Sequence, residues 1–464
     1  MSISRRDLLK VTGVGAAALA MSGCATDFSK PAVSAATAGS NDKLLMPAPK
    51  GKRVVILGGG FGGLTVAKYL RKESHEIEVV VLEKRDNFMS CPYSNVWLGG
   101  VEGATLDVLS RDYFAPATKY GYHIIQTTIT GVDRATRTVM TTCGKIGYDY
   151  LVVAPGIEYD YSKLSGGDKV KEARLRMECP PALMPGSEHL ALKRQLEEFE
   201  EGNIIITVPE GAYRCPPAPY ERAAMMAYHI KKNGLKGKVL ILDPKDKPGA
   251  KPKEFMESYQ SLYPDIIEFH GNVFIKDVDL DKKIVKAVKK VGDNEQPVEF
   301  KYEIANIIPK NRANSLTKMV GVKTNADGYI AVKLPLHKSV DDPRVWACGD
   351  AIAAINFAAG SAYPKSGHMA NAQGKILARQ LAAEITGKAI DNMILPNNTC
   401  FSMVNGSPKE AIVVNHTVSL VVEKDASGKE VQKIKVGAKT GSRSKDLGVS
   451  TDEWLKGILN DIFG

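Results

Sequence analysis

A glycine-rich loop at residues 58–63 constrains the architecture of this chain more than any other feature. It follows the apolar, β-branched run 53–57 and precedes residues 64–71, whose pattern predicts a helix. In such a strand–loop–helix unit the first glycine permits a tight turn, the second lets the backbone approach a pyrophosphate, and the third lets the helix pack on the strand. These positions are held by Gly58, Gly60 and Gly63. The sequence therefore predicts a dinucleotide site at the N-terminus of the helix.

A carboxylate at the expected distance supports this prediction. The apolar run 79–82 predicts a second strand, which ends at Glu83, twenty residues after Gly63. A carboxylate there can accept hydrogen bonds from ribose hydroxyls and repels a 2′-phosphate. The glycine pattern alone would be a weak signal. Two strands, a loop, a helix and an acid in this order are specific for dinucleotide binding.

A second unit of this kind follows later, but its loop is different. Residues 202–209 predict a buried strand, and a further strand at 238–242 ends at Asp243. The turn between them, 210–222, contains three prolines and several bulky side chains where glycines would be needed. Such a turn prevents the close backbone approach that a pyrophosphate requires. We expect a nucleotide-binding fold that no longer binds NAD(P)H.

Two other segments resemble those of flavoproteins with two dinucleotide-binding domains. Residues 148–156 resemble the strand that leaves the FAD domain, and residues 345–350 resemble the strand that returns to it. In those flavoproteins the aspartate at the position of Asp350 holds the ribityl chain. Residues 363–368 then open a helix to about residue 385, whose N-terminus would stabilise negative charge on the flavin pyrimidine.

These patterns predict an α/β chain with more than one core, as 464 residues require. The resemblance implies two Rossmann-like three-layer domains of the glutathione-reductase type and a C-terminal α+β interface domain. The FAD domain is discontinuous, and the NAD-like domain is inserted into it. The expected parts are a signal peptide at 1–24, a linker at 25–50, an FAD domain at 51–165 and 304–390, an NAD-like domain at 166–303 and an interface domain at 391–464.

Three cysteines lie in segments that match one family. Cys91 follows Met-Ser, Cys215 begins Cys-Pro-Pro-Ala-Pro-Tyr-Glu-Arg, and Cys400 follows Asn-Thr. From about Arg53 to Gly464 the chain resembles the flavoprotein subunit of flavocytochrome c sulfide dehydrogenase, a relative of sulfide:quinone oxidoreductases. The resemblance implies a covalent bond from Cys91 to the flavin 8α-methyl and a redox disulfide between Cys215 and Cys400. The residues expected to hold FAD are Gly58, Gly60, Gly63, Glu83, Cys91, Ala154, Gly156, Gly349, Asp350 and Lys365.

The resemblance also implies a reaction. Hydrosulfide attacks the disulfide of Cys215 and Cys400, leaving a persulfide on one cysteine and a thiolate that passes two electrons to the flavin. Glu221 would act as acid or base, with a pKa raised by burial. Each role has an alternative: a structural disulfide, a free thiol at Cys91, a helix-terminus carboxylate at Glu221 and a surface lysine at Lys365.

The other cysteines have no assigned role. Cys348 lies in an apolar strand and is expected to pack there. Cys143 and Cys179 could pair, but the sequence does not show it.

The N-terminus indicates export. Arg5 and Arg6 precede a weakly apolar run at 11–21 that is too short to span a bilayer, which resembles a twin-arginine signal peptide. Cys24 ends a segment that resembles a lipoprotein cleavage box, and residues 25–50 have the composition of a flexible tether. We expect a periplasmic protein, lipid-anchored through Cys24 or simply cleaved. The alternative is a cytosolic N-terminal helix.

The electron acceptor is the least constrained element. The sequence contains no Cys-x-x-Cys-His, so no c-type haem is expected in this chain. The resemblance implies a separate cytochrome c as the acceptor. The alternative acceptor is a membrane quinone, because the tail from Asp452 carries an apolar stripe. Such a stripe fits either a membrane interface or a packed core. A third hypothesis is an electron-transfer flavoprotein with a purely structural disulfide. The net charge of +10 could steer an acidic partner or simply solvate the surface; no nucleic-acid module is recognisable.

Overall fold

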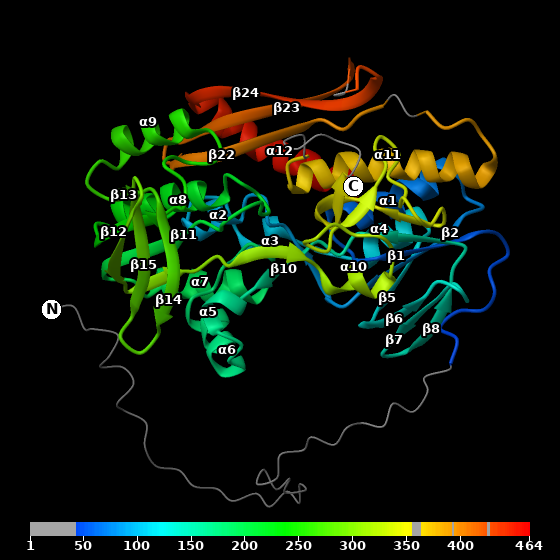
Figure 1. The fold of residues 1–464 in the computed structure, drawn as a ribbon, viewed down its shortest axis with the longest axis horizontal. Coiled ribbons are helices and arrows are strands. Elements are labelled where there is room, and N and C mark those ends of the chain that lie inside the picture. Colours follow the sequence, from blue (N-terminus) through cyan, green and yellow to red (C-terminus); the bar gives the residue numbers. More distant parts are fainter. Residues whose placement is uncertain (1–42, 355–362, 392–393, 425–426) are drawn as a thin grey trace, which may run out of the picture. The chain divides into compact units, whose positions relative to one another are not determined.

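The computed structural model describes residues 43–354, 363–391, 394–424 and 427–464, with two long domains side by side (Figure 1). The expected signal peptide, Cys24 and most of the expected linker lie outside these residues. No helix within the described ranges combines the length and hydropathy that a bilayer crossing needs.

The first domain is built on a five-stranded parallel sheet in the order β20-β9-β1-β2-β5. The central strand β1 (Arg53–Leu57) is completely buried, as expected for a strand covered on both faces. The other strands are β2 (Glu78–Glu83), β5 (His123–Gln126), β9 (Tyr150–Val153) and β20 (Val345–Ala347). Because β20 pairs with β9, the domain is discontinuous, as predicted.

Different layers cover the two faces of this sheet. On one face, α1 (Phe61–Glu73) and α11 (Gly367–Thr386) pack on Val54 and Ile56. On the other face, Val55 and Leu57 pack with the antiparallel strands β6 (Ile129–Asp133), β7 (Thr138–Thr141) and β8 (Gly144–Gly147). The first residues of the two helices are neighbours, because a Cβ on Gly367 would lie 3.2 Å from the Phe61 ring.

The second domain contains a four-stranded parallel sheet in the order β13-β12-β11-β17. Its strands are β11 (Glu201–Thr207), β12 (Lys236–Leu242), β13 (Ile267–His270) and β17 (Ile304–Asn306). Helix α8 (Ala218–Asn233) follows β11, and an antiparallel sheet is formed by β14 (Val273–Asp279), β15 (Ile284–Val291) and β16 (Asn294–Lys301). The predicted boundary at 303 is wrong by several residues, because β17 pairs with β11 and belongs to this domain.

The chain crosses between the two sheets twice, and the crossings lie side by side. β10 (Ile157–Asp160) leaves the first domain and β18 (Lys310–Ala313) returns to it, and the two strands pair antiparallel. The remaining short elements are α2 (Ser94–Leu98), α3 (Leu106–Leu109), α4 (Phe114–Tyr120), α5 (Ser162–Ser165), α6 (Lys169–Glu178), α7 (Ser187–Glu197), α9 (Pro252–Leu262), α10 (Ser315–Val320), β3 (Asn87–Met89), β4 (Ser110–Asp112), β19 (Ile330–Val332) and β21 (Ile352–Ala354).

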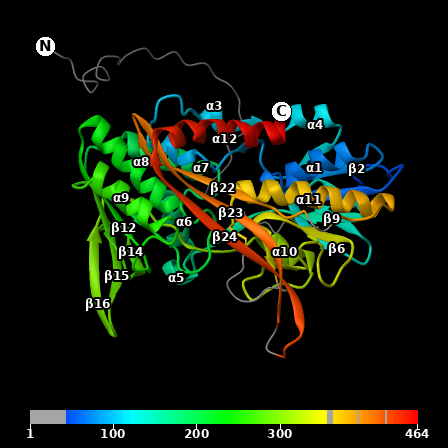
Figure 2. The ribbon, with the colours of Figure 1, turned by 90° about the horizontal axis from the view of Figure 1, so that it is seen from above.

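The C-terminal part is an antiparallel sheet of β22 (Asn398–Gly406), β23 (Lys409–Lys424) and β24 (Glu430–Ser444), followed by α12 (Lys445–Phe463). The two long strands run across the molecule past α9 and α11 (Figure 2). The apolar stripe of α12 faces inward, and its buried members are Leu455, Ile458, Leu459 and Ile462. This stripe is packed core, which is the second of the two interpretations that the sequence left open.

Candidate functional site

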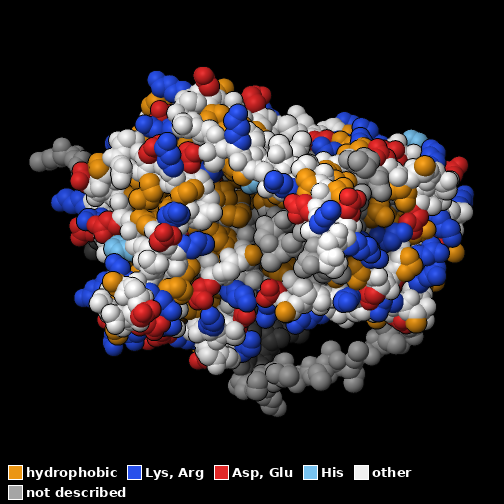
Figure 3. All heavy atoms as spheres, turned by 45° about the horizontal axis from the view of Figure 1, so that its top comes forward, with side chains coloured by type: hydrophobic (Ala, Val, Ile, Leu, Met, Phe, Trp, Pro, Cys, Tyr) orange, Lys and Arg blue, Asp and Glu red, His pale blue; other side chains and the backbone are white. Residues whose placement is uncertain are grey.

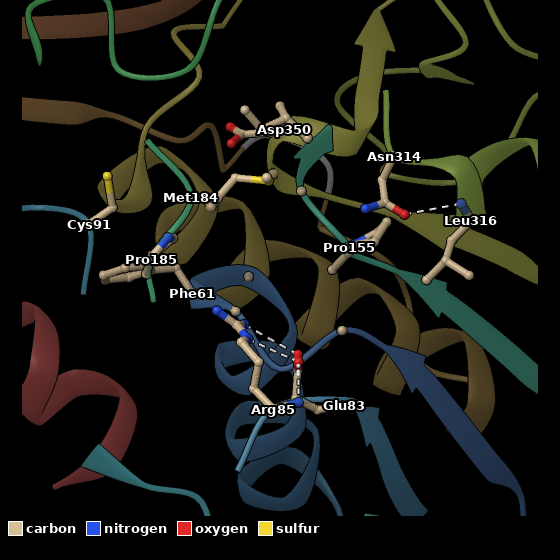
Figure 4. Close-up of a pocket in the computed structure, with 18 of the residues that line it drawn as sticks. Phe61, Glu83, Arg85, Cys91, Pro155, Met184, Pro185, Asn314, Leu316 and Asp350 are labelled. Carbon is tan, nitrogen blue, oxygen red and sulfur yellow. Dashed lines mark hydrogen bonds and ion pairs between the residues drawn. The ribbon is translucent and has the colours of Figure 1, made fainter. Parts of the chain in front are cut away.

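A cavity of about 420 Å³ lies where β1, α1 and the crossing strands meet (Figure 4). It extends from Glu83 and Arg85, past the glycine loop, to Cys91 and Asp350. Ala154, Gly156 and Gly349 also line it, so the segments expected to hold one cofactor do surround one space.

The three glycines of the loop differ in why a side chain is excluded at their positions. Gly58 has φ of 107°, a conformation that side chains rarely adopt, and a Cβ on Gly63 would lie 2.0 Å from the Gly58 carbonyl oxygen. A Cβ on Gly60 would instead meet no protein atom within 4 Å. Gly58 and Gly63 are therefore required by the protein itself, whereas Gly60 leaves space that faces the cavity.

Glu83 closes the far end of the cavity (Figure 4). Its carboxylate accepts from the backbone N–H of Gly59 at 2.6 Å and from the N–H groups of Lys84 and Arg85 at 3.0 Å each. The Arg85 guanidinium also donates to both oxygens. Burial raises the pKa of the Glu83 carboxyl, but Arg85 and the backbone donors outweigh this and lower it overall. An ionised Glu83 thus fixes the loop in addition to facing the cavity.

Asp350 presents an unused acceptor to the cavity. Its Oδ2 accepts from Arg214 Nε at 2.5 Å, while its buried Oδ1 has no hydrogen-bond partner among the described residues. A buried acceptor without a partner is costly, so it indicates a donor that binds here. A ribityl hydroxyl would supply such a donor.

Lys365 does not face the cavity, in contrast to its predicted role beside the flavin. Its ammonium donates to the carbonyl of Asp350 at 2.8 Å and to that of Ile352 at 3.4 Å, and it lies 3.8 Å from the centre of the Tyr329 ring. Burial lowers its pKa to about 8. Lys365 is a half-buried residue that fixes the backbone around Asp350, and it is not the freely solvated surface lysine of the alternative.

A second, smaller cavity of about 30 Å³ brings the cysteines together. Cys215, Cys400 and Cys91 all line it, with Glu221 and the ring of Trp454. Cys91 and Cys215 line the larger cavity as well, so the two spaces share one wall. Cys215 and Cys400 are separate thiols in this structure, and the disulfide between them remains a prediction.

Cys215 is held at this wall by the turn that replaced the second glycine loop. The residue has φ of 56°, in the left-handed region, and its N–H donates to the Lys365 carbonyl at 2.7 Å. Backbone strain of this kind persists where the surroundings enforce it, as at functional sites. The turn thus faces the first domain, and its prolines end at the start of α8.

The acid that ends β12 is also occupied by protein. Asp243 is fully buried and accepts the hydroxyl of Tyr220 at 2.5 Å and the backbone N–H of Lys245 at 2.9 Å. A carboxylate at this position would bind ribose in an NAD domain. The tyrosine of the proline-rich turn takes that place, which supports the expectation that NAD(P)H does not bind.

Glu221 is a buried carboxyl beside the cysteines. It accepts from Asn95 Nδ2 and from the Met403 backbone N–H, both at 2.8 Å. Burial raises the pKa of Glu221, and the two donors lower it to a smaller extent. Its contacts join α2, α8 and β22, so one carboxyl links three separate parts of the chain to the small cavity.

Replacing Glu221 with glutamine tests its predicted acid–base role. A base acts only when ionised, and a raised pKa moves the rise of activity with pH above the range of an ordinary glutamate. We expect Glu221→Gln to lower kcat by about 100-fold and to remove this rise from the pH profile of kcat/KM. An unchanged profile in a variant with normal FAD content would contradict the role.

The other cysteines lie apart from one another. Cys143 is exposed in the turn between β7 and β8, whereas Cys179 is fully buried with its Sγ 3.7 Å from the Tyr302 hydroxyl. They do not pair in this structure. Cys348 is fully buried in the first core and also reaches the wall of the larger cavity.

The sequence analysis did not identify three residues that contact the site, namely Arg214, Asn95 and Lys251. Arg214 pairs with Asp350, Asn95 binds Glu221, and the buried ammonium of Lys251 donates to the Cys400 carbonyl at 3.1 Å. Only Arg214 had a usable signal, its place next to Cys215. Lysine at a loop–helix junction normally predicts a solvated side chain.

Comparison with known proteins agrees with this geometry. Residues 189–309 match the family described as the central part of the sulfide dehydrogenase (flavocytochrome c) flavoprotein chain, and residues 52–178 match the pyridine nucleotide-disulphide oxidoreductase family. Over 44 residues the sequence is 54% identical to the sulfide dehydrogenase flavoprotein chain of Chlorobaculum thiosulfatiphilum, covering 10% of this chain and 92% of that sequence. The chain belongs to the family of sulfide dehydrogenase flavoproteins and sulfide:quinone oxidoreductases.

More distant members match over a longer range. The sulfide-quinone reductase of Aquifex aeolicus is 28% identical over 54% of this chain and 57% of its own length, and the mitochondrial enzyme of mouse is 23% identical over 64% and 65%. The chain thus spans less than two thirds of these relatives. A solved structure of a sulfide:quinone oxidoreductase from Aquifex aeolicus has a TM-score of 0.68 at 19% identity, covering 89% of this chain and 91% of that one, which shows the shared fold.

This family implies FAD, and the larger cavity fits it. Gly60 leaves open space at the N-terminus of α1 for a pyrophosphate, and Glu83 lies at the ribose end. The partnerless Oδ1 of Asp350 meets the need of a ribityl hydroxyl. The flavin end of the cofactor would then lie at the wall formed by Cys91 and Cys215.

Proposed function

We propose that this protein is an FAD-dependent sulfide dehydrogenase that oxidises sulfide to sulfur or polysulfide through Cys215 and Cys400 and passes the electrons to a c-type cytochrome. One observation carries the proposal: both cysteines and the buried carboxyl of Glu221 line one small cavity that shares a wall with the nucleotide cavity. The family supplies the sulfur chemistry that such a pair performs.

The chain's own residues account for the first half of the reaction. Hydrosulfide attacks one sulfur of the Cys215–Cys400 disulfide, forming a persulfide and releasing a thiolate. Glu221 lies where it can take or return the proton of the sulfur species. FAD, when bound, accepts two electrons and releases them singly.

Two features favour a cytochrome over a quinone as acceptor. Residues 189–309 match the family model of the flavocytochrome c flavoprotein chain, and a 44-residue stretch, 10% of this chain, is 54% identical to such a chain. The apolar stripe of α12, the feature that would have suited a membrane interface, is buried in the core. Basic and acidic side chains are interspersed with hydrophobic ones over the face shown in Figure 3, so this face by itself favours neither acceptor.

A direct competition tests the acceptor. Purified holoprotein is supplied with sulfide together with oxidised cytochrome c and a short-chain quinone, and both reductions are followed. We expect cytochrome c to be reduced in preference. Reduction of the quinone alone would overturn the cytochrome assignment in favour of a sulfide:quinone oxidoreductase, while no sulfide consumption with either acceptor would overturn the function itself.

Covalent attachment of FAD through Cys91 is a separate prediction. Acid precipitation of the purified protein should leave the yellow colour in the pellet, because a thioether bond survives denaturation. Cys91→Ser should release the colour into the supernatant while the fold is kept. Colour in the supernatant of the unchanged protein would contradict the attachment.

We also propose that the protein works in the periplasm. This proposal rests on Arg5, Arg6 and the short apolar run that follows them, and on the oxidised disulfide that the reaction needs. Fractionation of cells that express the full chain tests the periplasmic location. Membrane-bound protein in a Cys24→Ser variant would contradict a lipid anchor.

A further inference from the structure

Lys251 is a buried cation without a fixed counter-ion. Its side chain is 3% exposed, and no ion pair to an Asp or Glu of the described residues is formed by its ammonium. The Nζ donates to the Cys400 carbonyl at 3.1 Å and to Ser402 Oγ at 2.7 Å, both neutral groups. A buried ammonium is costly unless an anion offsets it.

The backbone at Lys251 is strained into place. The residue has φ of 48° and ψ of 48°, a left-handed conformation that is rare for a side chain of this size, and it caps the N-terminus of α9. A cation at the N-terminus of a helix is also disfavoured by the helix dipole. Two unfavourable features at one buried residue point to a function at that place.

The groups around Lys251 are those that change charge in the proposed reaction. Electrostatic interactions link Lys251 to Cys400 of β22, to Glu221 of α8 and to Cys215 in the turn before α8. They raise the pKa of Lys251, which burial lowers overall. Glu254 of α9 and His416 of β23 are the other titratable groups that interact with it. Burial raises the pKa of the Cys400 thiol, and the Lys251 ammonium is the largest influence that lowers it.

We propose that Lys251 is the counter-ion of a thiolate on Cys400, and that it makes Cys400 the leaving sulfur when hydrosulfide opens the disulfide. This inference rests on the proposed function. The attack forms a bond between hydrosulfide and Cys215 Sγ, breaks the bond to Cys400, and leaves the electron pair on Cys400. Hydrosulfide brings one negative charge, and Cys400 leaves with one, so the step conserves charge. The Lys251 ammonium offsets the negative charge that arrives on Cys400.

The difference in exposure between the two cysteines agrees with attack on Cys215 and departure of Cys400. Cys400 is only 9% exposed and lies beside the ammonium, whereas Cys215 is less buried and reaches both cavities. The incoming nucleophile thus meets Cys215, and the charge it displaces arrives at the buried cation. Lys251 acts through Cys400 and is a positioning residue.

The test measures Cys400 directly and needs no sulfide. Holoprotein is reduced, treated with methyl methanethiosulfonate at a series of pH values, and the modification rate of the peptide containing Cys400 is followed by mass spectrometry. The rate follows the thiolate fraction. Lys251→Gln keeps hydrogen-bonding capacity for the Cys400 carbonyl and Ser402 but loses the charge. Its midpoint should rise by about one pH unit, which makes modification about tenfold slower below the midpoint.

Two controls make the result specific. Lys253→Met removes an equal charge from an exposed side chain of the same helix, and Lys251→Arg keeps the cation; both should show the wild-type midpoint. An unchanged Cys400 midpoint in Lys251→Gln, with wild-type FAD content and melting temperature, would overturn the proposal. If Lys251→Gln fails to fold, the Lys251→Arg variant tests the proposal instead. Because it keeps the positive charge, a shifted Cys400 midpoint in this variant would contradict a role for the charge. A shift in Lys251→Gln without sulfide turnover by the wild type would refute the proposed function alone.

Discussion

Replacing Cys215 with serine will lower the rate at which sulfide bleaches the flavin by at least about 1000-fold. The substitution removes one of two sulfurs that the reaction requires, and loss of a residue that forms the covalent intermediate costs this much or more in other enzymes. Cys400→Ser should have the same effect, because either change prevents the disulfide. The measurement is anaerobic loss of flavin absorbance after mixing with sulfide.

Cys143→Ser is the matched control for this experiment. Cys143 is an exposed thiol in a turn of the first domain, so its removal should leave the rate unchanged. If bleaching survives both Cys215→Ser and Cys400→Ser, the cysteines have only a structural role. The disulfide mechanism would then be wrong, because sulfide would reduce the flavin without it.

The second large effect is expected at the glycine loop, where two substitutions should fail in different ways. Gly63→Ala places a Cβ 2.0 Å from the Gly58 carbonyl oxygen, so helix α1 must move away from β1. We expect a loss of about 3 kcal/mol in the free energy of unfolding, at the upper end for overpacking, with loss of FAD. Denaturant unfolding of the apoprotein measures this.

Gly60→Ala should leave the apoprotein intact and weaken only cofactor binding. A Cβ at this position meets no protein atom within 4 Å, and Gly60 has φ of −88°, which any residue adopts. The added methyl group projects into space that the pyrophosphate is expected to need. In a Cys91→Ser background, from which FAD can be removed, the apoprotein should unfold within about 1 kcal/mol of its Gly60 parent, with at least about tenfold weaker FAD binding. Undiminished FAD binding would place the cofactor elsewhere.

The sequence predicted the parts of this molecule that depend on local backbone requirements. A glycine is needed at position 58 because of its positive φ and at position 63 because of a close approach, so the loop is visible in the residues themselves. The effect of the prolines in the second loop is equally local, because each removes a backbone N–H donor and adds a bulky ring to the turn. The discontinuous first domain was implied by the resemblance of two short strands to those of known flavoproteins, and β20 does pair with β9.

What the sequence missed depends on side-chain direction and on contacts between distant segments. Lys365 lies in the expected segment, but its ammonium turns away from the cavity toward the carbonyl of Asp350. Lys251 has the sequence context of a surface lysine and becomes buried only because β22 packs against the start of α9. The boundary at 303 was wrong because the pairing of β17 with β11 is a contact across about a hundred residues.

The sequence by itself thus determined a dinucleotide loop, the loss of a second one, and three cysteines in segments typical of one family. Only the tertiary structure decided that Cys215, Cys400 and Glu221 meet in one cavity, that the stripe of α12 is core, and that a lysine lies beside Cys400. The reason is physical. Glycine and proline restrict the backbone at their own positions, whereas the environment of a thiol or a carboxyl is set by whichever distant segments fold against it.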